Sequence, residues 1–127
     1  ENLARTDGWT RSALKESLSK PHVFSLVAES QGQLMAHVLG TAVLDEAEIL
    51  TIAVRPQHRR HGIARALLNS CYDNWSIAGV ISAYLEVRHS NQGARALYQA
   101  TGWEVVGTRA GYYRDGETAV LMRWSQS

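Results

Sequence analysis

The hydrophobic and polar positions of the chain divide its first half into short segments with the period of strands. Apolar residues dominate 23–29, 33–44 and 49–54, and short polar turns separate these segments. Such segments predict three strands, and turns as short as Ser30–Gly32 and Asp45–Glu46 make consecutive strands antiparallel neighbours. The third segment, from Ile49 to Val54, is almost wholly apolar, which is typical of a strand buried on both faces.

A helix follows the three strands. Five apolar residues recur at the spacing of one helical face, namely Ala64, Leu67, Leu68, Cys71 and Trp75. Gly79 suits the end of this helix, and the alternation over 81–87 predicts a strand directly after it. A strand–helix–strand connection favours a parallel pair, so we expect these two strands to run in the same direction.

Another helix and two strands complete the predicted order. Ser90 or Asn91 caps a helix that Gly102 closes, and residues 103–108 and 118–124 form a final pair of strands. A further helix over about 11–20 precedes the first strand. The pattern therefore predicts an α/β fold with a sheet of mixed direction.

Composition excludes several classes of protein. The 127 residues are 45% hydrophobic and 20% charged, which predicts one soluble domain over residues 1–127. Thirteen basic and twelve acidic residues give a net charge of +1, so no global field attracts nucleic acid or an anionic membrane. No apolar run approaches the ~20 residues of a membrane span. The single cysteine, Cys71, excludes an internal disulfide and suits a cytoplasmic protein.

A basic segment that contains a glycine connects the third predicted strand to the following helix. It reads Arg55-Pro56-Gln57-His58-Arg59-Arg60-His61-Gly62-Ile63-Ala64. The unpaired N–H groups at a helix N-terminus favour an anion, and Gly62 allows the backbone to approach it closely. By itself the segment fits either a phosphate-binding loop or an ordinary basic turn. It matches neither GxxxxGK(S/T) nor GxGxxG.

Together with its flanks, this segment resembles the pyrophosphate motif of the GNAT superfamily of N-acetyltransferases. That motif has Gln or Arg, then Gly three residues later and Gly or Ala five residues later, here Arg59, Gly62 and Ala64. Further segments follow in the family's order and spacing: Leu85–Arg88, Ser90–Asn91, Ala96–Tyr98 and Gly102–Trp103. The tail, with Arg109–Tyr113 and Ala119–Met122, is similar to the ribosomal-protein-alanine N-acetyltransferase branch.

The resemblance implies a mixed, mostly antiparallel sheet with helices on both faces and a central parallel pair that splays to admit acetyl-CoA. It assigns backbone contacts with this cosubstrate to Ile52, Ala53 and Val54, and a hydrogen bond with the pantetheine to Asn91. It assigns the pyrophosphate to Arg59, Arg60, His61, Gly62, Ile63, Ala64 and Arg65. The family's first strand would precede Glu1.

The same resemblance implies two catalytic side chains. Glu86 corresponds to the general base, which removes a proton from the acceptor amine through water. Tyr98 corresponds to the acid that protonates the sulfur of coenzyme A. By pattern alone Glu86 is a surface residue and Tyr98 a core residue. Tyr84, Tyr112 and Tyr113 are expected to contact the acceptor, although the last two also fit plain packing.

The acceptor implied by the resemblance is the N-terminal alanine of a ribosomal protein, bound by a monomer or weak dimer. An α-amine has a pKa near 8 and a lysine near 10.4, so one glutamate deprotonates the α-amine more readily. The acidic group Asp45, Glu46 and Glu48 keeps open a GNAT enzyme acting on a small amine, and a lysine acceptor also stays open. A non-catalytic acyl-CoA-binding module is disfavoured because Glu86 and Tyr98 are both present. We expect no metal, since the histidines lack carboxylate or cysteine partners at ligand spacing.

Overall fold

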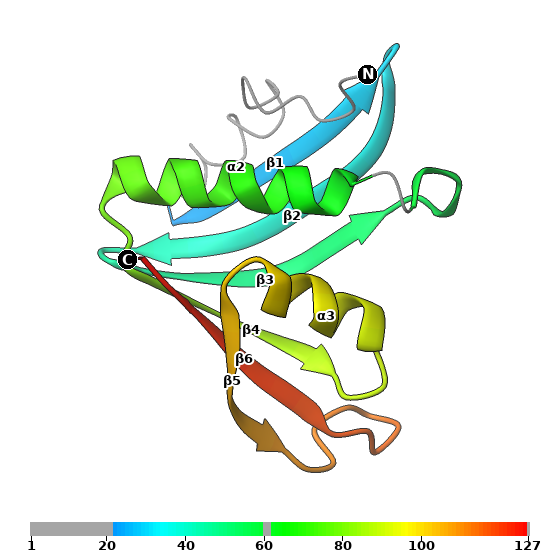
Figure 1. Ribbon diagram of the computed structural model, residues 1–127, viewed down its shortest axis with the longest axis vertical. Coiled ribbons are helices and arrows are strands. Elements are labelled where there is room, and N and C mark those ends of the chain that lie inside the picture. Colours follow the sequence, from blue (N-terminus) through cyan, green and yellow to red (C-terminus); the bar gives the residue numbers. More distant parts are fainter. Residues whose placement is uncertain (1–21, 60–61, 127) are drawn as a thin grey trace.

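The computed structural model describes residues 22–59 and 62–126, which form one six-stranded sheet and two α-helices (Figure 1). The predicted helix over 11–20, together with Arg60 and His61, lies outside the described residues. The elements are β1 (Val23–Ser30), β2 (Gln33–Val43), β3 (Glu46–Val54), the 3₁₀ helix η1 (Pro56–His58), α2 (Ile63–Ala78), β4 (Ser82–Arg88), α3 (Gln92–Ala100), β5 (Trp103–Arg109) and β6 (Ala119–Ser125). Their order confirms the predicted mixed α/β fold.

The sheet has the strand order β1-β2-β3-β4-β6-β5, and all neighbours are antiparallel except β3 and β4. This parallel pair is bonded only where Glu46–Glu48 lies beside Ser82–Tyr84. Beyond that point the two strands diverge toward their carboxyl ends (Figure 1). The expected splay of the central pair is therefore present, and α2 supplies the crossover that a parallel connection needs.

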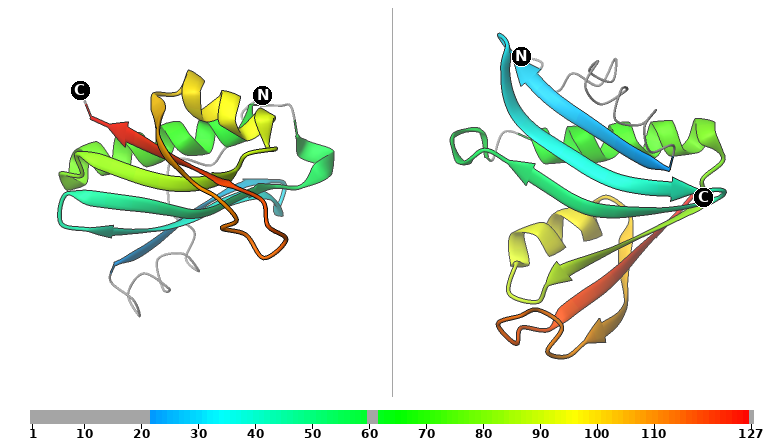
Figure 2. Two further views of the ribbon diagram at one scale, coloured as in Figure 1. Left: turned by 90° about the horizontal axis from the view of Figure 1, so that it is seen from below. Right: turned by 180° about the vertical axis from the view of Figure 1, so that it is seen from behind.

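Both described helices pack on the same face of the sheet (Figure 2, left). The ring of Trp75 in α2 lies 6.0 Å from Phe24 of β1 and 5.1 Å from Trp124 of β6. The ring of Tyr98 in α3 lies 6.0 Å from Trp103 of β5. Within the described residues the opposite face carries no helix, so the expectation of helices on both faces stays a prediction that concerns residues before β1.

The helix predicted from residues 64–75 is confirmed as α2. Four of its five stripe residues are buried, namely Leu67, Leu68, Cys71 and Trp75. Gly79 ends it in the left-handed conformation, with φ of 86°, as a C-cap glycine does. Burial raises the pKa of the Cys71 thiol to about 12, which keeps this cysteine an inert part of the core.

Strand β3 is not buried on both faces, so that interpretation of its composition was wrong. Thr51 pairs with Leu39 while Ile49 pairs with Gly40, which leaves Leu50 unpaired as a β-bulge. Ile49 is buried, but Leu50 is 55% exposed. The segment is apolar because the far half of β3 lines a groove rather than a second layer. Ile81, the first residue of the strand predicted over 81–87, is also exposed, because β4 begins only at Ser82.

Candidate active site

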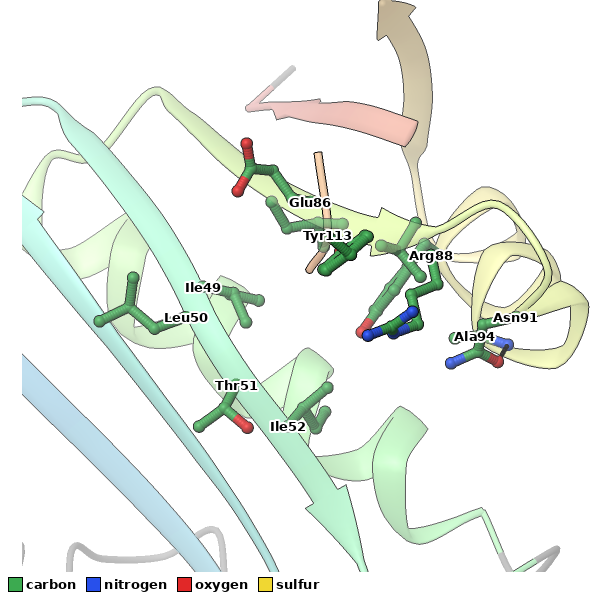
Figure 3. A pocket seen from close by; sticks show the side chains of 12 residues that line it. Ile49, Leu50, Thr51, Ile52, Glu86, Arg88, Asn91, Ala94 and Tyr113 are labelled. Carbon is green, nitrogen blue, oxygen red and sulfur yellow. Dashed lines mark hydrogen bonds between the residues drawn. The ribbon is translucent and has the colours of Figure 1, made fainter. Parts of the chain in front are cut away.

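A groove lies where β3 and β4 separate. Its larger part has a volume of about 700 Å³ between the end of β3, the start of α2 and the first turns of α3. A smaller part of about 230 Å³ lies between the bulged part of β3 and the end of β4 (Figure 3). The two parts share Ile52, Asn91, Ala94 and Tyr98. The two parts therefore adjoin each other at the split in the sheet.

The edge of β3 that faces the groove is an open strand edge. Residues Ile52, Ala53 and Val54 line the groove, and the pairing of β3 with β4 stops at Glu48. Unpaired N–H and C=O groups along such an edge bind an extended partner that carries amides of its own. The structure thus brings the three predicted backbone residues to one wall.

The larger part of the groove ends at the N-terminus of α2. Gly62, the N-cap, has φ of 75°, and apart from its chain neighbours no atom of the described residues lies within 4 Å of the Cβ that another residue would carry there. The first helical bond runs from Ala66 N to Gly62 O at 3.0 Å, so the N–H groups of Ile63, Ala64 and Arg65 have no helical acceptor. No acidic residue occupies the first turn. This arrangement favours an anion.

Arg59 extends the same site toward β3. Its Nε donates to the carbonyl of Val54 at 3.2 Å, which fixes the guanidinium group at the rim of the groove. His58 also lines this rim and is half-buried. Of the predicted pyrophosphate residues, Arg59 and Gly62–Arg65 border the groove, whereas Arg60 and His61 are not described.

Asn91 caps helix α3 and also borders the groove. Its Oδ1 accepts a hydrogen bond from Ala94 N at 3.2 Å, which caps α3. Within the described part of the chain its Nδ2 makes no hydrogen bond. Because Asn91 lines both parts of the groove, this amide is placed to donate to a ligand (Figure 3).

Tyr98 and Tyr72 are two mostly buried tyrosines with different surroundings. The Tyr72 hydroxyl donates to Thr101 Oγ1 at 3.0 Å and accepts from Trp103 Nε1 at 2.7 Å. The Tyr98 hydroxyl has no hydrogen-bond partner among the described residues, and Tyr98 lines both parts of the groove. Burial raises the pKa of Tyr98 to about 12, so its phenol stays protonated at ordinary pH.

Glu86 reaches the smaller part of the groove from the other face of the sheet. On β4 it alternates with Leu85 and Val87, which are buried beneath the helices. One carboxylate oxygen lies 3.6 Å from Arg109 Nη1. A hydrogen bond with the same carboxylate, and then its charge, raises the pKa of Tyr112. Glu86 and Tyr98 therefore border one cavity from opposite faces of the split sheet.

The three tyrosines expected at the acceptor site do not lie together. Tyr113 lines the smaller cavity, and Tyr112 meets its ring edge-on at 5.1 Å. Tyr84 borders neither part of the groove and lies instead beside Arg123, whose guanidinium carbon is 6.0 Å from the tyrosine ring. The geometry supports an acceptor role for Tyr112 and Tyr113 more than for Tyr84.

Several residues at this site were not found from the sequence. Leu50 lines the smaller cavity because of the bulge, and Arg88 lines it from the end of β4 (Figure 3). Arg109 and Glu117 reach Glu86 and Arg88 from the β5–β6 hairpin. The sequence holds no signal for such pairs, since they join residues far apart in the chain.

Residues 22–59 and 62–126 contain neither a cluster of metal ligands nor a helix suited to a membrane. No three His, Cys, Asp or Glu side chains are grouped there as a metal site would require. None of the helices there has the length and apolar character to cross a membrane.

The groove, the split sheet and the helix start define a class of enzyme, and sequence comparison identifies the same class. The chain belongs to the acetyltransferase (GNAT) family, whose model matches residues 2–103. It is 38% identical over 122 residues to the N-alpha-acetyltransferase RimI of Mycobacterium tuberculosis, and the match covers 92% of this chain and 75% of that protein. The predicted N-acetyltransferase is thereby confirmed at the level of the family.

Two further relatives extend the comparison. The ribosomal protein bS18-alanine N-acetyltransferase of Escherichia coli is 42% identical over 94 residues, which cover 72% of this chain and 64% of that protein. This chain thus spans slightly less than two thirds of that relative. The crystal structure of the Escherichia coli ribosomal-protein-S18-alanine N-acetyltransferase superposes with a TM-score of 0.81, at 33% identity, over 98% of this chain and 82% of that one. A GNAT acetyltransferase of Elizabethkingia anophelis with acetyl-CoA bound shares the fold, with a TM-score of 0.77 at 15% identity over 92% and 84% of the two chains.

Proposed function

We propose that this chain transfers an acetyl group from acetyl-CoA to the α-amine of a protein N-terminus, and that its acceptor is the N-terminal alanine of a ribosomal protein. The observation that carries the proposal is the two-part groove at the split in the sheet. One end of the groove favours an anion, and the other end brings Glu86 and Tyr98 to the same cavity.

The chemistry of the residues that line the groove suits acetyl-CoA. The open edge of Ile52–Val54 offers hydrogen bonds to the amides of a pantetheine arm, and Asn91 Nδ2 offers another from the facing helix. The start of α2, with Arg59 and Arg65 beside it, suits the pyrophosphate. Bound acetyl-CoA supplies an activated acetyl group as a thioester.

The proposed mechanism is direct transfer with Glu86 as the base. An α-ammonium group with a pKa near 8 must lose a proton before it attacks, and the Glu86 carboxylate is the base that the smaller cavity offers. A water between the amine and Glu86 passes this proton on. Glu86 is well placed for this role because it reaches the cavity from the face opposite the helices.

Tyr98 acts as a hydrogen-bond donor at the leaving sulfur. Its phenol holds its proton because the pKa is about 12, and its hydroxyl has no competing partner within the described residues. A thiol has a pKa near 8.5, so complete proton transfer from such a phenol is unfavourable by ~3.5 units. Tyr98 therefore stabilises the departing thiolate mainly through a hydrogen bond. An unpaired backbone N–H near Val54 polarises the thioester carbonyl.

Turnover with defined acceptors tests the proposal. Four short peptides are compared, with an N-terminal Ala, Ser or Met, or with a blocked N-terminus and one internal Lys, and a polyamine serves as the small amine. We expect the highest kcat/KM for the alanine peptide. Preference for the polyamine or the lysine peptide would reject the acceptor, and a calorimetric titration with coenzyme A that stays flat at millimolar concentration would reject the cosubstrate.

A further inference from the structure

One carboxylate fastens the β5–β6 hairpin to the end of β4. Oε2 of Glu117 accepts a hydrogen bond from the backbone N–H of Ser90 at 2.7 Å. Its Oε1 accepts another from Arg88 Nη1 at 2.8 Å. Hydrogen bonds from Ser90, followed by that from Arg88, lower the pKa of Glu117 to about 2, so the group stays ionised above that value.

The contact between Glu117 and Arg88 lies on the acceptor side of the groove. The Arg88 guanidinium also bonds Asp115 at 2.9 Å and lies 4.2 Å from the centre of the Tyr113 ring. Both Arg88 and Tyr113 line the smaller cavity, in which Glu86 also lies. Glu117 therefore fixes the cation against which Tyr113 rests.

The contact between Glu117 and Ser90 lies on the acetyl-CoA side of the groove. Ser90 directly precedes Asn91, which caps α3 and lines both parts of the groove. A shift of Ser90 would move the start of α3 and with it the Asn91 amide. Two walls of the groove, one with Arg88 and Tyr113 and the other with Asn91, thus meet at the Glu117 side chain.

We propose that Glu117 is a positioning residue that couples the acceptor and acetyl-CoA sites, by holding Tyr113 and Asn91 in one fixed arrangement. The inference rests on the proposed function of the groove. The Arg88 and Glu117 side chains are 43% and 23% exposed, and ion pairs open to solvent add little to stability, so the loss of Glu117 should lower Tm only modestly. When a loop adopts its competent conformation for only a fraction of the time, the apparent affinity of its ligand falls by that fraction.

The kinetic test compares Glu117→Gln with two controls. Asp115→Asn also removes a carboxylate from Arg88 but leaves the bond with Ser90, and Glu104→Gln removes the charge of an exposed residue on β5. We expect Glu117→Gln to raise the acceptor KM about fivefold or more at saturating acetyl-CoA, with kcat less affected and each control within about twofold of wild type. An unchanged acceptor KM, or an equal rise in Asp115→Asn, would refute the role of Glu117.

The coupling itself is measured by calorimetry with coenzyme A, in the presence and absence of an N-terminally acetylated peptide. In the wild type the peptide should change the Kd of coenzyme A by at least about twofold, and in Glu117→Gln the ratio should approach one. A ratio of one in the wild type, or an undiminished ratio in the variant, would refute the coupling.

Two checks separate the possible failures. If Glu117→Gln does not fold, Arg88→Gln breaks the link to Tyr113 while the Ser90 bond stays, and it should raise the acceptor KM without changing the Kd of coenzyme A. If Arg88→Gln changed neither the acceptor KM nor the Kd of coenzyme A, the inference would be refuted. A wild-type protein that acetylates no peptide refutes the proposed function, whereas an active wild type with an indifferent Glu117→Gln refutes only the coupling.

Discussion

Replacing Tyr98 with Phe removes one hydroxyl from the groove and breaks no hydrogen bond among the described residues. If this hydroxyl stabilises the leaving thiolate, kcat should fall by roughly 10²-fold or more, the usual range for a general acid. Such a loss corresponds to about 2.7 kcal/mol in the activation barrier. The free energy of unfolding should stay nearly unchanged, because the ring still packs against Trp103.

Tyr72→Phe is the matched control, since it removes the hydroxyl of a neighbouring, largely buried tyrosine. Here the loss leaves the indole N–H of Trp103, which is only 2% exposed, without its acceptor. An unsatisfied buried donor costs roughly 1–3 kcal/mol. For a domain of this size each kcal/mol lowers Tm by about 4 °C. Tyr72→Phe should therefore melt earlier and keep its kcat.

Steady-state kinetics and thermal unfolding of both variants decide the matter. The pKa of Tyr98 is raised to about 12 from 10, so ionisation of this phenol weakens the fold only as pH rises above about 10. The Tyr98→Phe variant should therefore show the same pH dependence of the rate as the wild type below about pH 10. Near-normal turnover of Tyr98→Phe, or equal loss of activity in Tyr72→Phe, would show that Tyr98 only packs.

Three other substitutions test separate parts of the site. Glu86→Gln should lower kcat and change its pH dependence, because it removes the proton acceptor, and an unchanged pH–rate profile would reject that role. Gly62→Glu should weaken coenzyme A binding in calorimetry more than Gly32→Glu does; both glycines have positive φ and open space, but only Gly62 adjoins the groove. Equal effects would assign the loss to backbone strain. Arg109→Gln removes a half-exposed cation that lies 3.6 Å from the Glu86 carboxylate. We expect Tm to change little and the acceptor KM to fall. A rise in the acceptor KM would show that Arg109 assists binding of the acceptor.

Periodicity predicted the elements well, because burial on one face leaves a direct trace in the sequence. The stripe of α2 is predicted in this way, whereas the caps Asn91 and Gly79 are predicted from the residue types that favour helix ends. The bulge at Leu50 left no such trace, since an apolar run has the same composition whether it enters a core or lines a groove. The contacts between charged residues could not be predicted from the sequence, for a different reason. Glu117 meets Arg88 only after two antiparallel pairings bring the hairpin beside β4, and nothing near either residue indicates the other.

The short contact between β3 and β4 leaves the sheet as two half-sheets joined at one end. Three residue pairs, from Glu46–Ser82 to Glu48–Tyr84, carry the pairing at the centre of the sheet. An extended ligand in the gap would add hydrogen bonds where the strands lack them and would act as an extra strand. A ligand at a hundred times its Kd adds about 2.7 kcal/mol to the folded state. Amide hydrogen exchange along Ile52–Val54 should then slow on binding, because the ligand bonds to this edge and links the two halves.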